Sequence, residues 1–168
     1  MAHKPKTEQV SKTNAMRALD RAGIAYDLKV YEVEDETSVN LGLRVAEATG
    51  IDPDAAFKTL VCCSPTGSYA VFCIPVGAEL DLKKAAQAAR QKSLSLLPIH
   101  DLPKVTGYIR GGCSPVGMKK PFPTFFDETA LLFDKIAVSG GRIGTQILLD
   151  PETLVSFCDG TFIDLVED

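Results

Sequence analysis

The sequence predicts a single α+β domain built around a mixed, curled β-sheet. Segments typical of strands outnumber those typical of helices, and the two kinds do not follow one another in a regular βαβ order. The chain has 168 residues, 45% of them hydrophobic, which is enough for one substantial core but not for two large ones. We find no internal repeat, low-complexity segment or linker, so we assign residues 10–168 to one domain behind a flexible leader at residues 1–9.

The helices are predicted from apolar residues at helical spacing and from residues that cap helix ends. In the first helix, apolar residues recur every three or four positions until Gly23, and Gly50 ends the second helix in the same way. Asp81 is a good N-cap for the third helix, whose inner face would carry Leu82 and Ala85. The predicted helices span residues 11–22, 43–49, 82–89, 98–105 and 150–157.

The strands are predicted from alternating or continuously apolar segments between turn residues. Residues 26–33 alternate as in a half-buried strand, and an acidic loop follows at residues 34–36. Two apolar strands at residues 58–64 and 69–76 are joined by Pro65-Thr66-Gly67-Ser68, as in a β-hairpin. Further strands are predicted at residues 93–97, 124–126, 135–139, 146–149 and 162–166.

Charge and cysteine usage exclude several classes of protein. The net charge of −4 argues against a protein that coats nucleic acid through bulk electrostatics, although Lys119 and Lys120 could form a local basic contact. The five cysteines form no Cys-x-x-Cys pair, and His3 and His100 are the two histidines, so the spacing predicts no metal site and no cofactor. No apolar stretch reaches the roughly 18 residues of a membrane span, and the polar N-terminus is unlike a signal peptide, which favours a cytoplasmic protein.

Lys58 is the first candidate functional residue. In a strand its side chain lies on the same face as Leu60 and Cys62, beside residues of the buried type, where an ammonium group is costly without a partner. One interpretation is a lysine at a sheet edge whose ammonium group reaches water. The other is a fixed positive charge at the lip of a pocket, and the residues alone do not decide between the two.

The run Gly111-Gly112-Cys113-Ser114-Pro115-Val116-Gly117 is the second candidate. Its glycine pair can aim several backbone N–H groups at one point, while the Ser-Pro pair limits how far the loop relaxes. The run is either a tight connection between strands or a cradle of donors for a carbonyl or phosphate oxygen. A second run, Ser139-Gly140-Gly141-Arg142-Ile143-Gly144, suggests that two such loops line one cleft, although it lacks the Gly-x-Gly-x-x-Gly pattern of dinucleotide sites.

Conventional hydrolytic machinery is missing from the sequence. His3 lies in the leader and His100 is typical of a surface helix, so no Ser-His-Asp set is plausible. Cys113 has no neighbouring base and is interpreted as a plain loop thiol. An enzyme with this sequence would not supply a conventional nucleophile or base.

Five motifs follow one another in a recognisable order and spacing. They are Phe57-Lys58-Thr59-Leu60-Val61, Asp81-Leu82-Lys83-Lys84-Ala85, Thr106-Gly107-Tyr108, the first glycine run continued by Met118-Lys119-Lys120, and Val138 with the second glycine run. From about Ser11 onward the chain resembles the YbaK/EbsC family of free-standing aminoacyl-tRNA deacylases, which are related to the editing insertion of bacterial prolyl-tRNA synthetase.

The resemblance implies a barrel-like mixed sheet flanked by helices and one aminoacyl-tRNA editing domain over residues 10–168. It also implies hydrolysis of a mischarged amino acid, with cysteine the favoured one, from tRNA(Pro) by substrate-assisted chemistry and without a cofactor. Aminoacylated tRNA(Pro) is then the expected partner, and a ternary complex with prolyl-tRNA synthetase a further expectation. Alanyl-tRNA(Pro) as the substrate, and a non-catalytic module that binds tRNA or a synthetase, are the two alternatives.

The same resemblance assigns site residues. Lys58 matches the family's essential lysine and is the predicted catalytic residue, while Tyr31 matches a pocket tyrosine. The chain departs from the family where Leu41 replaces a frequent phenylalanine, Gln146 an aspartate of some members, and Cys113 the usual isoleucine. The predicted substrate-binding residues are Tyr31, Leu41, Thr59, Gly111, Gly112, Ser114, Pro115, Gly141 and Gln146.

Overall fold

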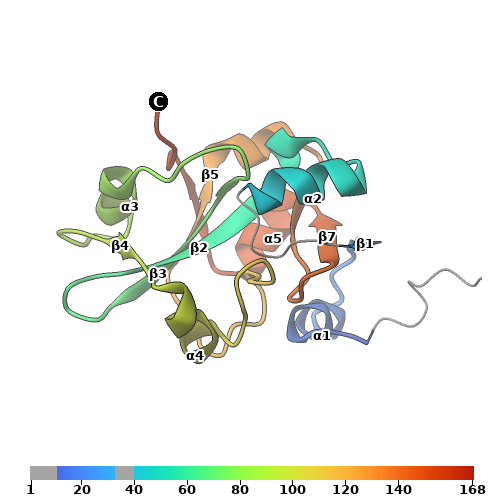
Figure 1. Ribbon diagram of the computed structural model, residues 1–168, viewed down its shortest axis with the longest axis horizontal. Helices are drawn as coiled ribbons and strands as arrows, with labels where there is room; N and C mark the ends of the chain where they lie inside the picture. Colours follow the sequence, from blue (N-terminus) through green and yellow to red (C-terminus); the bar gives the residue numbers. More distant parts are fainter. Residues whose placement is uncertain (1–10, 33–39) are drawn as a thin grey trace, which may run out of the picture.

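Two β-sheets meet at the centre of the molecule in the computed structural model, which describes residues 11–32 and 40–168 (Figure 1). A three-stranded antiparallel sheet has the order β1 (Asp27–Val30), β7 (Thr145–Leu149), β6 (Ile136–Ser139). A five-stranded sheet has the order β4 (Ser95–Leu96), β2 (Phe57–Cys63), β3 (Tyr69–Pro75), β5 (Thr124–Asp127), β8 (Thr161–Ile163), with β5 parallel to both of its neighbours. The predicted α+β class and mixed sheet are confirmed.

The two sheets are hydrogen-bonded to each other at a single β-bridge and diverge beyond it. A single parallel bridge links Ala56, just before β2, to Ala137 in β6. The described strands therefore form a curled pair of sheets rather than one closed barrel. Ser139 ends β6 two residues after the bridge, and no ladder of backbone hydrogen bonds joins β2 to β6 among the described strands.

Five α-helices surround the sheets in the described part of the chain. Side chains cap the start of α1, α3 and α5: for example, the Thr13 hydroxyl accepts from the Met16 N–H (3.1 Å), and the Asp150 carboxylate accepts from the Thr153 N–H (2.8 Å). The helices are α1 (Asn14–Arg21), α2 (Leu41–Thr49), α3 (Leu82–Ala88), α4 (Leu102–Thr106) and α5 (Pro151–Phe157). Short 3₁₀ helices lie at Pro53–Ala55, Ile99–Asp101 and Glu128–Leu132.

The core consists of two apolar clusters on opposite faces of β2 and β3. Phe57 and Val61 belong to the cluster that also holds residues of β6 and β7, whereas Leu60 and Cys62 pack in the cluster under α3. This alternation along β2 is the one that the sequence predicts for a strand. Lys58 shares a face with Leu60, so its stem starts on the α3 side of the sheet.

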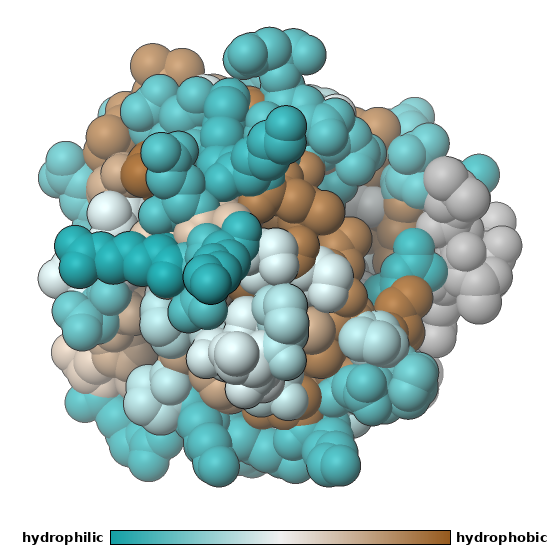
Figure 2. Space-filling model, turned by 90° about the vertical axis from the view of Figure 1, so that its left-hand side faces the viewer, coloured by the Kyte–Doolittle hydropathy of each residue, from teal (hydrophilic) through white to brown (hydrophobic). Residues whose placement is uncertain are grey.

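Several predicted boundaries need correction. Leu82, expected on the inner face of its helix, is 40% exposed, because α3 begins at Leu82 and buries Ala85 and Ala86 instead. Figure 2 looks onto the side of the molecule that carries α3, and there hydrophilic side chains surround a band of hydrophobic ones. The last strand, predicted at residues 162–166, ends at Ile163, and Val166 makes only a single bridge to Leu80.

Three predictions fall partly or wholly outside the described residues. They concern the leader at residues 1–9, the acidic loop at residues 34–36 and the end of the first predicted strand at Val33. No helix among the described residues is long and apolar enough to cross a membrane.

Candidate functional site

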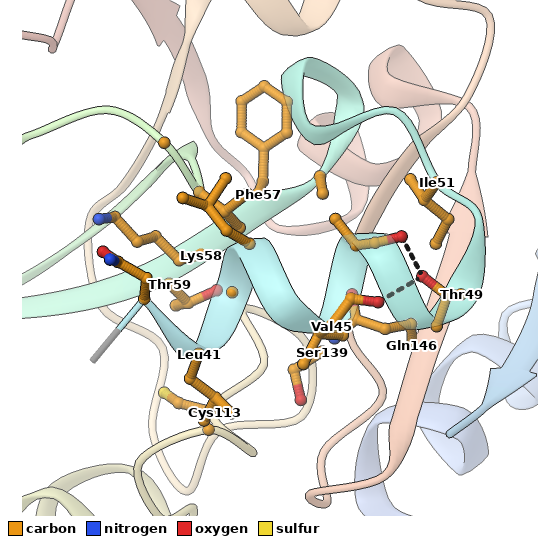
Figure 3. Close-up of a pocket in the computed structure, with 18 of the residues that line it drawn as sticks. Leu41, Val45, Thr49, Ile51, Phe57, Lys58, Thr59, Cys113, Ser139 and Gln146 are labelled. Carbon is orange, nitrogen blue, oxygen red and sulfur yellow. Dashed lines mark hydrogen bonds between the residues drawn. The ribbon is translucent and has the colours of Figure 1, made fainter. Parts of the chain in front are cut away.

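A cavity of about 380 Å³ lies where the two sheets part. Its walls come from α2, from residues 56–60 at the start of β2, from the first glycine run and from the facing ends of β6 and β7. Figure 3 shows α2 crossing in front of β2, with Lys58 and Thr59 near the first turn of the helix. Of the residues predicted from the sequence, the cavity brings together Tyr31, Leu41, Lys58, Thr59, Gly111 and Gln146.

The backbone of β2 presents an open edge to this cavity. The Val76 N–H donates to the Ala56 carbonyl (2.8 Å), so even-numbered residues of β2 direct their backbone groups at β3. Odd-numbered residues face the other way, and the Val61 carbonyl accepts there from the Leu97 N–H (2.9 Å). Within the described residues β4 pairs only with Cys62 and Cys63, so no strand covers the Thr59 backbone on that side.

Lys58 combines partial burial with an unpaired charge. Its side chain is half-buried and lines the cavity, and among the described residues no carboxylate lies within ion-pair distance of its ammonium group. Other lysines do have partners, since Lys84 pairs with Asp164 (2.9 Å) and Lys135 with Asp27 (2.7 Å). Because leaving a partly desolvated charge unpaired costs free energy, this arrangement favours the pocket interpretation of Lys58 over the plain edge lysine.

The first glycine run contributes Gly111 to the wall. Gly111 has φ +83°, and a Cβ there would lie 3.1 Å from Leu41 Cδ2 and 3.3 Å from Ile143 Cγ1. A side chain at this position would therefore be strained and would push on α2. Glycine is what lets the loop approach the first residue of α2 so closely.

Gly112, predicted to bind substrate, lies outside the cavity lining. Its N–H donates to the Ile109 carbonyl (2.9 Å) and is used within the turn. Gly112 is buried, with its Cα against the backbone of Arg142 and Ile143 in the second glycine run, and it does not line the cavity. Gly111 and Cys113, which do line it, make no backbone hydrogen bond through their N–H groups to another described residue.

Ser114 and Pro115 lie behind the wall rather than in it. Both are buried, the Ser114 hydroxyl accepts from the Val116 N–H (3.2 Å), and the Pro115 carbonyl faces the Cys158 thiol (3.6 Å). The Ser-Pro pair therefore fixes the loop from the core side. Neither residue lines the cavity, and their contact with a substrate stays a prediction.

Gly141 is also set back from the cavity. A Cβ at Gly141 would lie 3.1 Å from both Thr13 Cβ and Tyr108 Cε1, because the second glycine run packs against the start of α1. The Thr13 hydroxyl donates to the Gly140 carbonyl (2.5 Å) and holds this contact. The two glycine runs do pack together, but the second contributes only its first residue, Ser139, to the cavity lining.

Tyr31, Gln146 and Leu41 reach the cavity from three different elements. Tyr31 follows β1, is 9% exposed, and is held by its N–H, which donates to the Gly144 carbonyl (3.0 Å). Gln146, also 9% exposed, lies in the middle of its sheet between Lys29 and Ser139. Leu41 opens α2 and lies beside Cys113 in Figure 3.

Sequence reasoning missed several cavity residues. Glu79 and Arg110 bring opposite charges to its lining, and both are exposed. Of the apolar wall formed by α2, only Leu41 was predicted, although the spacing of Leu41 and Val45 along one helix face would have indicated the rest. The remaining unpredicted positions include Thr49, Ile51, Val76 and Ser139.

Cys113 lines the cavity but is not equipped to attack a substrate. Burial raises the pKa of its thiol to about 12, so the nucleophilic thiolate is scarce at neutral pH. This agrees with its interpretation as a loop thiol. Among residues 11–32 and 40–168, no three His, Cys, Asp or Glu side chains come together as metal ligands would.

Comparison with known proteins identifies the family. Residues 43–157 match the model of the aminoacyl-tRNA editing domain. The chain is also 45% identical, over 165 residues and 96% of both chains, to EbsC of Enterococcus faecalis, which carries the provisional name Cys-tRNA(Pro)/Cys-tRNA(Cys) deacylase. This protein belongs to the aminoacyl-tRNA editing domain family. It is therefore an enzyme of the aminoacyl-tRNA deacylase class, as the sequence motifs predict.

Solved structures share the fold of this editing domain. One, described provisionally as a trans-editing enzyme for prolyl-tRNA synthetase, superposes with a TM-score of 0.80 at 23% identity and covers 99% of this chain and 100% of its own. Another, described as a hypothetical protein, gives a TM-score of 0.82 at 21% identity, covering 92% of this chain and 100% of its own. The editing-domain architecture is thus confirmed over nearly the whole length.

Proposed function

We propose that this editing domain acts in trans to hydrolyse the ester of Cys-tRNA(Pro), with Cys-tRNA(Cys) as a second substrate. The observation that carries the proposal is the cavity between the two sheets, where Lys58, which has no ion-pair partner in the described part of the chain, lies with Gly111 and Tyr31. Its volume of about 380 Å³ is at the lower end of the range for small-molecule pockets, about 300–1,000 Å³. Such a site suits a small aminoacyl group at the end of a tRNA.

Lys58 is proposed to hold the 3′ end of the tRNA. A lysine ammonium group is a compact point charge with three donors, well suited to phosphate and ribose oxygens. Arg110, on the exposed side of the lining, would add a second contact to the phosphate backbone. These two cations supply local attraction for tRNA although the net charge of the chain is −4.

The backbone is proposed to stabilise the negative charge that forms on the ester carbonyl oxygen. The N–H groups of Gly111 and Cys113 are the available donors, since that of Gly112 is bound to Ile109. The open Thr59 backbone lies along the same cavity and offers one further donor and one acceptor. These groups would orient the ester rather than attack it.

The attacking group is proposed to come from the substrate. The cysteine thiol can add to its own carbonyl carbon: the C–S bond forms, the ester C–O bond breaks, and the ribose oxygen takes the proton. Water then hydrolyses the thioester to free cysteine. Alternatively, the neighbouring ribose hydroxyl orients the water that attacks directly, and in both routes proximity supplies several kcal/mol of the barrier reduction.

The central test is single-turnover deacylation of Cys-tRNA(Pro) by the Lys58→Ala variant. We expect the rate to fall about 100-fold or more, as for removal of a key electrostatic group. Lys92→Ala is the matched control, because Lys92 is an exposed lysine outside the cavity, and its rate should stay normal. Lys58→Ala with a normal rate would overturn the role given to Lys58.

Parallel assays with Cys-, Ala- and Pro-tRNA(Pro) define the substrate. Size discriminates poorly among small side chains, where one methylene is worth about 1–3 kcal/mol, so alanine is the close alternative. Cleavage of Cys-tRNA(Pro) alone would favour attack by the thiol. A tRNA ending in 2′-deoxyadenosine tests the ribose hydroxyl, because loss of cleavage there would assign the chemistry to that group.

The family places the protein among deacylases, so tight binding of aminoacylated tRNA(Pro) without cleavage would contradict the proposed substrate. We also propose that selectivity for tRNA(Pro) comes from a ternary complex with prolyl-tRNA synthetase. The acidic net charge supports this proposal, since it predicts weak intrinsic affinity for tRNA. Adding the synthetase should then raise the deacylation rate at low enzyme concentration.

A further inference from the structure

Glu79 supplies the carboxylate of the cavity lining, within the part of the chain that the structure describes. Its backbone is fixed, because the Glu79 carbonyl accepts from the Glu167 N–H (3.0 Å) and the next residue, Leu80, bridges to Val166. Its side chain is exposed and makes no ion pair or hydrogen bond with another described residue. The Glu79 carboxylate thus extends from a fixed backbone at the cavity and has no partner among the described residues.

Glu79 and Lys58 line one cavity yet do not pair with each other. Opposite charges that share a cavity attract, so their separation leaves each one available to a ligand of the opposite sign. An aminoacylated tRNA end carries both signs: negative phosphates on the nucleotide side and a positive α-ammonium group on the amino acid. The cavity has the complementary pair.

We propose that the Glu79 carboxylate binds the α-ammonium group of the aminoacyl ester. This inference rests on the proposed deacylase function and names the group that recognises the amino-acid end. Lys58 would bind the nucleotide and Glu79 the ammonium group, so the ester that joins these two parts of the substrate is held at both ends. Recognition of a free amine also disfavours peptidyl-tRNA, whose α-nitrogen is an uncharged amide.

The test compares two substrates of the unmodified protein and of the Glu79→Gln variant. Cys-tRNA(Pro) carries the ammonium group and N-acetyl-Cys-tRNA(Pro) does not, while both keep the thiol, the ester and the tRNA. A mildly acidic assay keeps the amine protonated, since its reference pKa is about 8. We expect Glu79→Gln to lower kcat/KM for Cys-tRNA(Pro) about tenfold, the effect of losing one charge-assisted hydrogen bond, and to leave N-acetyl-Cys-tRNA(Pro) unchanged.

Glu167→Gln is the matched control. It removes the same charge next to the Glu79 backbone, but its side chain is exposed and outside the cavity, so it reports any general gain in tRNA attraction. Glu79→Asp should recover part of the lost rate. A Glu79→Gln variant that slows both substrates equally, or neither, would overturn the proposal.

The outcome is separable from that of the proposed function. If the unmodified protein cleaves no cysteinyl-tRNA, the deacylase proposal fails before Glu79 is tested. If it cleaves Cys-tRNA(Pro) and Glu79→Gln does not change the ratio between the two substrates, only the role of Glu79 fails.

Discussion

The two glycine runs look alike in the sequence but do different work in the fold. The run at residues 111–117 places Gly111 on the cavity wall against Leu41, whereas the run at residues 139–144 packs against α1 and the back of the first run. Gly140 is the clearest contrast, since a Cβ there would lie 2.6 Å from Thr145 Oγ1 and 2.9 Å from Thr145 Cβ. The first run forms part of the cavity wall, and the second packs against α1 and supports the first.

A glycine pair in the sequence therefore indicates that the backbone comes close to another part of the protein, but not whether that part belongs to a site or to the core. What the glycine approaches decides its function: Gly111 faces a helix that roofs a cavity, and Gly140 faces a buried threonine whose hydroxyl donates to the Arg142 carbonyl (2.7 Å). Substitution of Gly140 should therefore affect stability, and substitution of Gly111 should affect activity.

Gly140→Ala should have the largest effect on stability. The added methyl group would overlap Thr145, which is 2% exposed and cannot move aside, so we expect the free energy of unfolding to fall by about 3 kcal/mol. Urea unfolding measures this change. Deacylation per folded molecule should stay near normal, and a stable variant with lost activity would break the comparison.

Gly111→Ala should have the largest effect on activity. Its Cβ would press on Leu41 and Ile143, displacing the wall of the cavity, and a displacement of about 1 Å can cost about 100-fold in rate. Single-turnover deacylation measures the loss. Unfolding free energy should fall by only about 1–2 kcal/mol, the cost of a positive φ angle.

Gly67→Ala is the matched control for Gly111→Ala. Gly67 lies in the β2–β3 turn with φ +88°, nearly the angle of Gly111, and a Cβ there meets nothing within 4 Å. It should lose similar stability and keep its activity. Equal loss of activity in both variants would show that strain, and not contact with α2, slows Gly111→Ala.

Alkaline pH should lower the free energy of unfolding through two buried thiols at or near the first glycine run. Burial raises the pKa of the Cys113 and Cys158 thiols to about 12, above the ordinary value of 9.0 that they regain on unfolding. Their contribution to stability is therefore complete below about pH 9 and is lost as the pH rises from 9 toward 12. Each thiol adds a slope of about 1.4 kcal/mol per pH unit in that window.

Unfolding under reducing conditions at several pH values between 8 and 11 measures that slope. Cys113→Ala should reduce the slope by about 1.4 kcal/mol per pH unit, the contribution of one thiol. Its deacylation rate should stay near normal, because the thiol is protonated at neutral pH and is not the nucleophile. A large loss of activity in Cys113→Ala would contradict this account of the loop.

Much of the fold could be predicted because local signals agreed with the tertiary structure. The Asp81 and Asp150 caps, the Gly50 stop and the β2–β3 hairpin all rest on short-range chemistry that the folded chain keeps. Exposure of Leu82 could not be predicted, because it depends on where the short helix α3 meets the second core cluster. The division of the sheet depends likewise on the single Ala56–Ala137 bridge between distant segments.

The site was predictable where a residue type is itself unusual. A lysine beside apolar strand residues and a glycine pair followed by Ser-Pro could both be found along the sequence, but only the structure shows that Lys58 has no ion-pair partner among the described residues. Glu79 and Arg110 could not, because exposed charges are common and only the fold brings these two to the cavity. The sequence also does not show that Gly112 and Ser114 lie outside the cavity lining, because neighbouring residues of a loop need not face the same way.

The most direct measurement is the structure of the protein bound to a non-hydrolysable analogue, adenosine with cysteine joined to its 3′ position by an amide. The aminoacyl group should occupy the cavity between α2 and β2, with its carbonyl oxygen at the Gly111 and Cys113 N–H groups and the Lys58 ammonium group on the nucleotide. An analogue bound elsewhere, with this cavity empty and Lys58 untouched, would contradict the account.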